Sequence, residues 1–193
     1  MFRKSFNELK SLRTLVIVAM LLAVGFVLES FTIQITQILR ISFAFLPMAG
    51  IGMLFGPVVG LLAGFVGDII FYFANPIGGF QPLYILLGGL QGFIYGSVLY
   101  YKNFQLSRFE YKSVQLHSRA VVARLLDIVF VNLLGNTAAL IHYKWIVEDT
   151  FAAAVATRVA KNAIELFADV PLLLAILPAL LLAYNRNFSK KEI

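Results

Sequence analysis

The sequence predicts an all-α integral membrane protein, a compact bundle of six transmembrane helices with both termini cytoplasmic. Of the 193 residues, 60% are hydrophobic and only 13% are charged, whereas about a quarter of the residues of a soluble domain are charged. Long apolar runs also recur between short polar breaks, and about 20 apolar residues suffice for one helical crossing. We therefore expect a single membrane domain over residues 1–193, and we exclude a soluble enzyme, a secreted disulfide scaffold and a disordered tail.

The first three spans are expected near residues 12–28, 41–55 and 58–74. An amphipathic and basic segment precedes the first span. The second is rather short for a full crossing. The third follows at once after Gly56-Pro57, a pair that marks a tight turn or a helix break.

The other three spans are expected near residues 83–101, 120–141 and 162–184. A turn-rich loop at 75–82 precedes the fourth, and the most polar stretch of the chain, 102–118, separates it from the fifth. A second polar loop and an alanine-rich stretch lead into the sixth. No long-period repeat interrupts this order, which favours one helical domain.

The distribution of basic residues gives the orientation. With cytoplasmic termini and six spans, 12 of the 16 lysines and arginines lie inside, and the exceptions are Arg40, Lys144, Arg158 and Lys161. This agrees with the excess of Lys and Arg found in cytoplasmic loops. The net charge of +6 is thus explained by topology, and no nucleic-acid partner is expected.

Small residues recur at helical spacing and indicate close packing. Glycines repeat every fourth residue at 56, 60 and 64 and again at 88, 92 and 96, a pattern that lets helix backbones approach closely. Ala19 and Ala23 form another pair one turn apart. They either pack inside the bundle or form a smooth face on which another membrane subunit docks.

Ionisable side chains at membrane depth cost about 2.5 kcal/mol or more each, so they usually face a cavity or a partner. We expect Asp127 to pair with Arg124. Asp68 either anchors a polar network or contacts a ligand. The full set of candidates is Glu29, Asp68, Asp127, Arg158, Lys161, Glu165 and Asp169.

Two polar stripes predict a pocket open to the outside. Residues 158, 161, 162, 165 and 169 fall on one broad helix face. That face either neutralises itself, with Arg158 or Lys161 pairing with Glu165, or lines a polar pocket. A second stripe lies on the fifth span, at Asn132, Asn136 and Thr137, and the two stripes together make a pocket more plausible than either stripe alone.

Catalytic patterns are missing from the sequence. It contains no Walker A pattern, no His-Glu-x-x-His helix and no cysteine. His117 and His142 fall on opposite sides of the membrane, so they cannot share a metal. We therefore expect a binding protein with no catalytic residues, no metal and no cofactor of its own.

Several motifs give the chain a resemblance to a known family. Residues 39–47 (LRISFAFLP) and 52–60 (GMLFGPVVG), together with 67–69, 92–96, 136–137 and 158–162, resemble the folate-type branch of the substrate-binding S components of energy-coupling factor (ECF) vitamin transporters. The likeness extends over nearly the whole chain. One departure concerns the loop before the fourth span, where that branch has a Phe-Pro-Gly-Phe-Thr run and this chain has GFQPLY at 79–84.

The resemblance implies a subunit of an ABC-type importer in the bacterial plasma membrane. It would capture a small water-soluble vitamin or precursor from outside, with hydroxymethylpyrimidine or pyridoxine as the first expectation and folate close behind. Ala19 and Ala23 would dock onto an EcfT-like membrane coupling subunit driven by two cytoplasmic ATPases. A membrane scaffold or assembly protein, and a small enzyme that modifies lipids, remain the alternatives.

For the ligand site, aromatic and polar side chains receive separate roles. One group would gate the pocket or stack on a flat heterocycle, and another would supply hydrogen bonds. The first group is Phe80, Gln81 and Tyr84, and the second is Asn132, Asn136, Arg158, Lys161 and Asn162.

Overall fold

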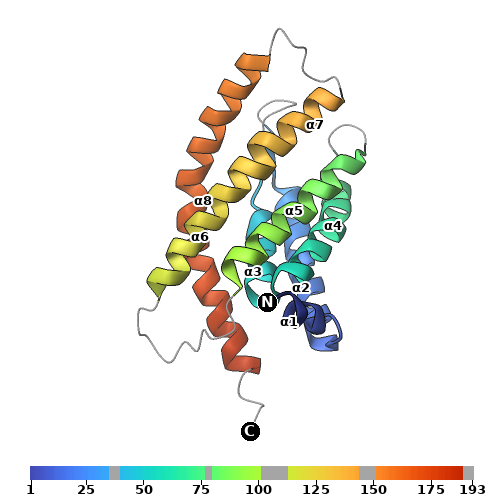
Figure 1. Cartoon of the computed structure of the whole chain (residues 1–193), viewed down its shortest axis with the longest axis vertical. Coiled ribbons are helices and arrows are strands. Elements are labelled where there is room, and N and C mark those ends of the chain that lie inside the picture. Colours follow the sequence, from blue (N-terminus) through green and yellow to red (C-terminus); the bar gives the residue numbers. More distant parts are fainter. Residues whose placement is uncertain (35–39, 77–79, 101–112, 144–150, 189–193) are drawn as a thin grey trace.

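The protein is a bundle of helices, seen in a computed structural model that describes residues 1–34, 40–76, 80–100, 113–143 and 151–188 (Figure 1). The only strands in this described part are β1 and β2, two residues each, which pair antiparallel with Ile33 opposite Ile41. The elements are α1 (Phe2–Glu8), α2 (Leu12–Ser30), β1 (Ile33–Gln34), β2 (Arg40–Ile41), α3 (Phe45–Phe55), α4 (Pro57–Ala74), α5 (Pro82–Leu99), α6 (Ser113–Asp127), the π-helical η1 (Ile128–Gly135), α7 (Asn136–His142) and α8 (Phe151–Phe188).

Five helical segments are long and apolar enough to cross a membrane. Their outer surfaces carry exposed Leu, Val, Ile and Phe side chains, which suit a lipid environment. The class expected from the composition, a helical multi-pass membrane protein, is thereby confirmed. The five segments are Leu12–Ser30, Pro57–Ala74, Pro82–Leu99, Gln115–His142 and Val155–Asn187.

The segment predicted as the second span differs from the expectation. Its first residues are extended, because Ile41 pairs with β1 and the Ser42 hydroxyl oxygen accepts a hydrogen bond from the Ala44 amide at 3.2 Å. The helix that follows, α3, has 11 residues and is therefore about 16 Å long at 1.5 Å per residue. Every residue of α3 except Leu54 is buried. This short helix thus forms the centre of the bundle, where it joins one apolar core with residues of α2, α4, α5, α6 and α8.

A sharp corner separates α3 from α4, as the Gly56-Pro57 pair predicts. Gly56 has a φ of 87°, a left-handed conformation that favours glycine. Ser5 of α1 completes the corner: its hydroxyl donates to the Phe55 carbonyl at 2.7 Å and accepts from the Val58 and Val59 amides at 3.0 and 3.3 Å. Ser5 therefore caps the end of one helix and the start of the next from about 50 residues away.

The two glycine repeats face each other, which confirms the packing role predicted for them. A Cβ atom on Gly60 would lie 2.3 Å from the carbonyl oxygen of Gly92, and one on Gly64 would lie 2.1 Å from that of Gly88. The pairing runs antiparallel, since positions later in α4 meet positions earlier in α5. No side chain fits between these backbones, so α4 and α5 pack as one layer.

The fifth and sixth predicted spans are longer in the structure than in the sequence analysis. Residues 113–143 form one helical rod in which η1 joins α6 to α7. Helix α8 has 38 residues; it includes the alanine-rich stretch and continues through Pro171 and Pro178. Each proline lacks an amide proton and crowds the preceding turn, and α8 changes direction along its length (Figure 1). Helix α8 ends at the same end of the bundle as α1 (Figure 1).

A prediction follows from the glycine faces. Gly60→Ala should destabilise the folded protein by about 1–3 kcal/mol, because the backbones of α4 and α5 must separate. Gly67→Ala on the same helix is the matched control, since its Cβ would meet side-chain atoms and no backbone, the nearest being the ends of Met48 at 3.0 Å and Leu22 at 3.2 Å. Thermal unfolding of the two variants in nanodiscs measures the difference. Equal losses of stability would contradict the packing described here.

Candidate functional site

Polar side chains gather at the end of the bundle that lies away from α1 and the end of α8. The first turn of α5, the rod from η1 to α7 and the first half of α8 meet at this end (Figure 1). The amide of Leu83 in α5 donates to the hydroxyl of Tyr143, just after α7, at 3.4 Å. All eight residues predicted for the ligand site belong to these three segments or immediately precede α5. The chain therefore brings the two predicted groups to one end.

Arg158 connects α8 to the π-helical segment. Its Nη1 donates to the backbone carbonyl of Asn132 at 3.3 Å, and the Asn136 amide donates to the Asn132 side-chain oxygen at 3.4 Å. A π-helical turn shifts the backbone hydrogen-bond register, and such turns occur frequently at functional sites. Arg158 is buried and also lies close enough to Tyr84 for an electrostatic interaction. These contacts join three of the helices that carry predicted site residues.

Four buried side-chain atoms near this end lack a hydrogen-bond partner within the described part of the chain. They are Gln81 Oε1, Thr137 Oγ1, Arg158 Nε and Asn162 Oδ1. A buried polar atom left unpaired costs about 1–3 kcal/mol. Their presence on three neighbouring segments is what a ligand-binding site requires, because a bound molecule can supply the missing partners. Thr137 belongs to the polar stripe of the fifth span but was not among the predicted site residues. Its buried, unpaired hydroxyl adds it to the candidate site, and sequence periodicity does not reveal such burial.

The remaining predicted residues have partners within the protein. Lys161 pairs with Glu165 at 2.8 Å, which is the ion pair expected if this helix face neutralises its own charges. Phe80 is exposed and packs edge-on against Tyr72 of α4, with ring centroids 5.3 Å apart. Phe80 thus lies at the α4 side of the site rather than against Arg158.

Below this site lies a buried ionic network that the sequence analysis foresaw only in part. Arg124 and Asp127 pair at 2.6 Å, as expected. The same guanidinium also donates to Asp169 of α8 through Nε, at 3.1 Å, and through Nη2. Tyr95 and Gln91 of α5 both donate to Asp127 at 3.2 Å. The network thus joins α5, α6 and α8.

The aromatic ring of Phe45 also packs against this network. The Arg124 guanidinium carbon lies 4.1 Å from the centre of the Phe45 ring of α3, a distance typical of a cation–π contact. Arg124, Asp127 and Asp169 are all almost completely buried. Asp169 had been grouped with the polar pocket face, but its contacts assign it to this structural network instead.

Two other ionisable candidates, Glu29 and Asp68, belong to α2 and α4. Glu29, near the end of α2, is buried and accepts a hydrogen bond from Ser42, which ties the segment before α3 to α2. Asp68 is half-buried in α4. The Arg40 side chain lies outside the described residues. Within the described ranges, no group of three His, Cys, Asp or Glu side chains is placed to hold a metal.

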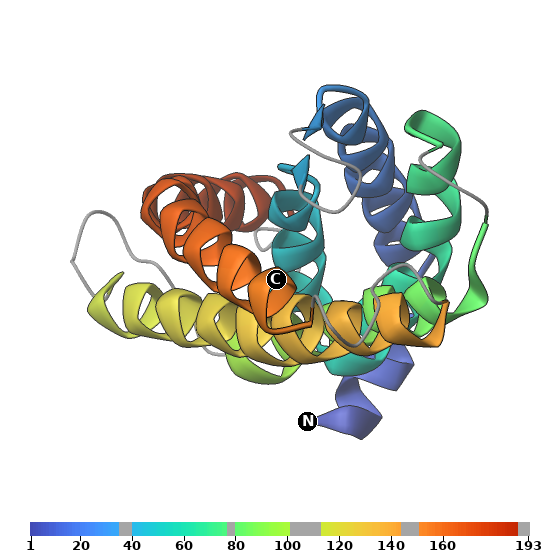
Figure 2. The same cartoon turned by 90° about the horizontal axis from the view of Figure 1, so that it is seen from above.

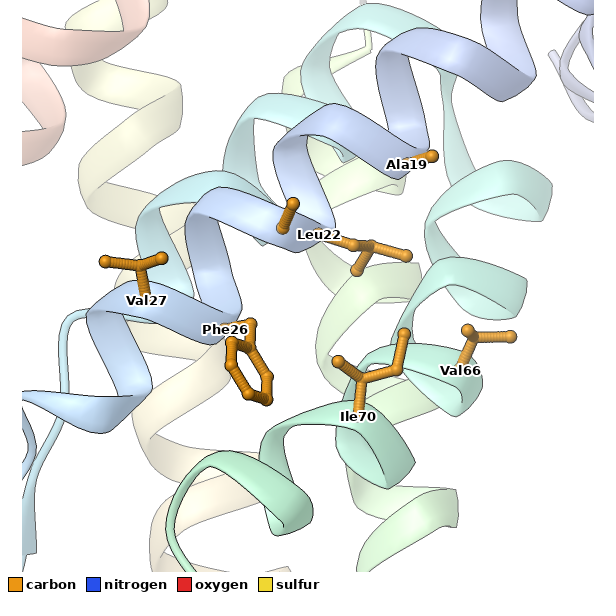
Figure 3. A pocket seen from close by; sticks show the side chains of 7 residues that line it. Ala19, Leu22, Phe26, Val27, Val66 and Ile70 are labelled. Carbon is orange, nitrogen blue, oxygen red and sulfur yellow. The ribbon is translucent and has the colours of Figure 1, made fainter.

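The alanine pair lies on a separate surface. Ala19 and Ala23 are exposed and line an apolar groove of about 520 Å³ between α2 and α4 (Figure 3). Neither alanine is buried, which disagrees with the first of the two alternatives, that the pair packs inside the bundle. The rest of the lining is apolar: Leu22, Phe26, Val27, Val66 and Ile70.

Comparison with known families decides the classification. Residues 9–178 match the model of the ECF-type riboflavin transporter S component family. The chain belongs to this family. Its members are S components of transporters and not enzymes, and the resemblance stated from the motifs is confirmed.

Individual relatives place this S component near folate carriers. It is 29% identical over 100 residues to the folate transporter FolT of Clostridium novyi, a match that covers 52% of the chain and 58% of that protein. It is 33% identical over 92 residues to an uncharacterised protein of Mycoplasma pneumoniae, covering 45% of the chain and 32% of that protein. The matched regions thus span less than two thirds of either relative.

A solved structure shares the fold. The crystal structure of FolT bound with folic acid aligns with this S component at a TM-score of 0.69 and 27% sequence identity, covering 84% of this chain and 91% of that one. The similarity extends over all but a small part of both chains. It supports the folate-type assignment within the family.

The ionic network gives a testable prediction for this S component. Arg124→Leu should destabilise it by about 3–5 kcal/mol, because two carboxylates lose their buried counter-ion. Adding Asp127→Asn and Asp169→Asn should restore part of that stability. The measurement is unfolding in nanodiscs, with Arg186→Leu, an exposed arginine on α8, as the control. A loss no larger than that of the control would refute the assignment.

Proposed function

We propose that this S component captures a small water-soluble vitamin at the polar end of the bundle, with folate as the first ligand to test. The observation that carries the proposal is the set of buried polar atoms without partners on Gln81, Thr137, Arg158 and Asn162. They offer a heterocycle both donors and acceptors in a mostly apolar setting, the usual composition of a small-molecule site.

The proposed roles follow the chemistry of each side chain. Arg158 is a fixed donor, and a carboxylate or carbonyl of the ligand would accept from its Nε. Asn162 and Asn136, with Asn132 and Lys161 beside them, would complete the hydrogen bonds to ring nitrogens and oxygens. Tyr84 and Phe80 would stack on the flat ring or close over it, next to Gln81.

The choice of folate rests on the relatives. FolT of C. novyi is named a folate transporter, and the similar crystal structure contains folic acid. The GFQPLY segment at 79–84 departs from the folate-type motif, and for this reason hydroxymethylpyrimidine and pyridoxine are the competing ligands. The family model is named for riboflavin, which makes riboflavin a suitable comparison compound.

We further propose six crossings, both termini in the cytoplasm, and a single domain in a bacterial plasma membrane. Helix α3 spans about half of a 30 Å hydrocarbon core, and the four residues from Arg40 to Phe43, which precede the turn at Ala44, would add at most about 13 Å. Together they would carry the chain across. With cytoplasmic termini the polar site opens outward, and most lysines and arginines lie inside.

The groove at Ala19 and Ala23 is the proposed contact with the membrane coupling subunit, which two cytoplasmic ATPases would drive. Its small side chains allow a partner helix to approach closely. Support comes from the exposure of both alanines and from the apolar lining of the groove.

The first test of this function measures ligand affinity. Arg158→Ala and Asn162→Ala should each weaken folate binding more than tenfold, equivalent to about 1.4 kcal/mol, because each removes a proposed ligand contact. Arg186→Ala, at the opposite end of α8, should leave the affinity unchanged. Isothermal titration calorimetry in detergent measures all three. Wild-type affinity in both site variants would remove these residues from the site.

A second test separates docking from capture. Ala19→Trp combined with Ala23→Trp should abolish vitamin uptake in cells and leave ligand binding intact, because the bulky rings fill the groove. Ala168→Trp, an exposed alanine on α8, is the matched control and should transport normally. Normal uptake by the double variant would rule out the groove as the docking face.

The alternatives have distinct signatures. Mass spectrometry of the purified protein should detect a bound vitamin if the proposal is right. Turnover of a lipid phosphate that depends on Arg158, Lys161 or Asp169 would instead indicate a lipid-modifying enzyme. A protein that binds no vitamin and turns over no lipid would be a scaffold or assembly protein.

A further inference from the structure

Helix α1 carries three different surfaces around its axis. Ser5 points into the bundle and is completely buried. Phe2 and Phe6 lie one turn apart on a neighbouring face and are 54% and 55% exposed. Arg3 and Lys4 are exposed as well; at about 100° per residue Arg3 lies beside the phenylalanine pair and Lys4 lies opposite it. A solvent-exposed helix of a water-soluble domain would not present two phenylalanines in this way.

Three sets of contacts fix the rotation of α1, so these surfaces have defined directions. Ser5 is held by the Phe55 carbonyl and by the amides of Val58 and Val59 at the α3–α4 corner. The Thr14 hydroxyl of α2 donates to Glu8 at 3.1 Å. The Phe2 ring also stacks against Phe93 of α5, with centroids 6.1 Å apart. The helix therefore cannot roll to bury its phenylalanines without breaking the Ser5 contacts.

Helix α1 lies directly before α2, a segment long and apolar enough to cross a membrane. It contacts the corner at which α4 begins, and α2 begins four residues after it ends. The first turns of α2 extend the apolar surface with exposed Leu12, Leu15 and Val16. In the view from above, α1 projects beyond the other helices at this end (Figure 2). A short helix beside the start of a membrane-spanning helix would contact acyl chains on one side and headgroups on the other.

The charged residues in and around α1 indicate which lipid headgroups this helix would contact. The first 13 residues contain four basic side chains and one acidic side chain, that of Glu8. The basic residues are Arg3, Lys4, Lys10 and Arg13. Arg3 and Lys4 have no ion-pair partner among the residues that the structure describes. Basic residues beside an apolar face are the pattern of helices that lie in the plane of an anionic membrane surface.

We propose that α1 is a binding site for anionic phospholipids, in which Phe2 and Phe6 enter the acyl region and Arg3 and Lys4 bind the phosphate groups. The site is distinct from the vitamin site, which lies at the opposite end of the bundle. It does not depend on the identity of the vitamin, nor on the groove at Ala19 and Ala23.

Fluorescence quenching tests this site in the full-length protein. Phe6→Trp is introduced together with Trp145→Phe, which removes the single native tryptophan. The protein is placed in nanodiscs of equimolar phosphatidylcholine and phosphatidylglycerol, with bromine on the acyl chains of one lipid or the other. Bromine on phosphatidylglycerol should quench the tryptophan at least twofold more strongly than bromine on phosphatidylcholine.

Matched variants identify the source of the preference. Arg3→Gln with Lys4→Gln should bring the ratio of the two quenching values to about one, while quenching itself persists because Phe2 and the new tryptophan still contact lipid. Arg186→Gln, which removes a basic side chain at the same end of the bundle but outside α1, should preserve the twofold ratio. The proposal is overturned if neither brominated lipid quenches, if both quench equally in the parent protein, or if the double variant keeps the preference.

Discussion

The bundle depends on one arginine placed where charge is expensive. Arg124 is buried among apolar helices, and its charge is tolerated because Asp127 and Asp169 pair with it from the same helix and from α8. Tyr95 and Gln91 of α5 also donate to Asp127. These contacts together set how α5, α6 and α8 lie against one another. The polar site lies further along the same α8 face, where Arg158 and Asn162 precede Asp169 by two to three turns. The ionic network thus fixes the position of the residues proposed to bind the vitamin.

The two surfaces proposed to be functional differ in their chemistry. The polar end has buried donors and acceptors that the protein leaves unpaired, whereas the groove at Ala19 and Ala23 is apolar and open. They also involve different helices: α5, α7 and α8 for the polar end, α2 and α4 for the groove. The tightly packed glycine layer of α4 and α5 lies between them. A ligand and a protein partner would therefore contact the chain at separate places.

Much of the fold could be predicted from local pattern, and the failures have physical causes. Apolar runs located the long helices, and four-residue spacing identified the glycine faces as close-packing surfaces, although not that they meet each other. The Arg124–Asp127 pair is three residues apart and therefore visible in the sequence, but its partner Asp169 is 45 residues away and nothing local indicates it. The start of α3 was misplaced because the apolar run begins at Ile41, and only the pairing of this residue with Ile33 of β1 makes it extended. At the site, the residue types and the shared helix face were predictable. Which atoms remain unpaired depends on packing between helices.

The Ser5 contact affects how the chain can be handled in the laboratory. A short exposed helix before the first long apolar segment resembles a dispensable tail, and such tails are commonly trimmed or fused to purification tags. Here, removing it would expose the Phe55 carbonyl and the amides of Val58 and Val59 at the point where the central helix turns back. The loss of stability would therefore affect the middle of the bundle rather than its edge. Tags for purification and immobilisation therefore belong at the other end of the chain, since Arg186 and Asn187 near the end of α8 are exposed.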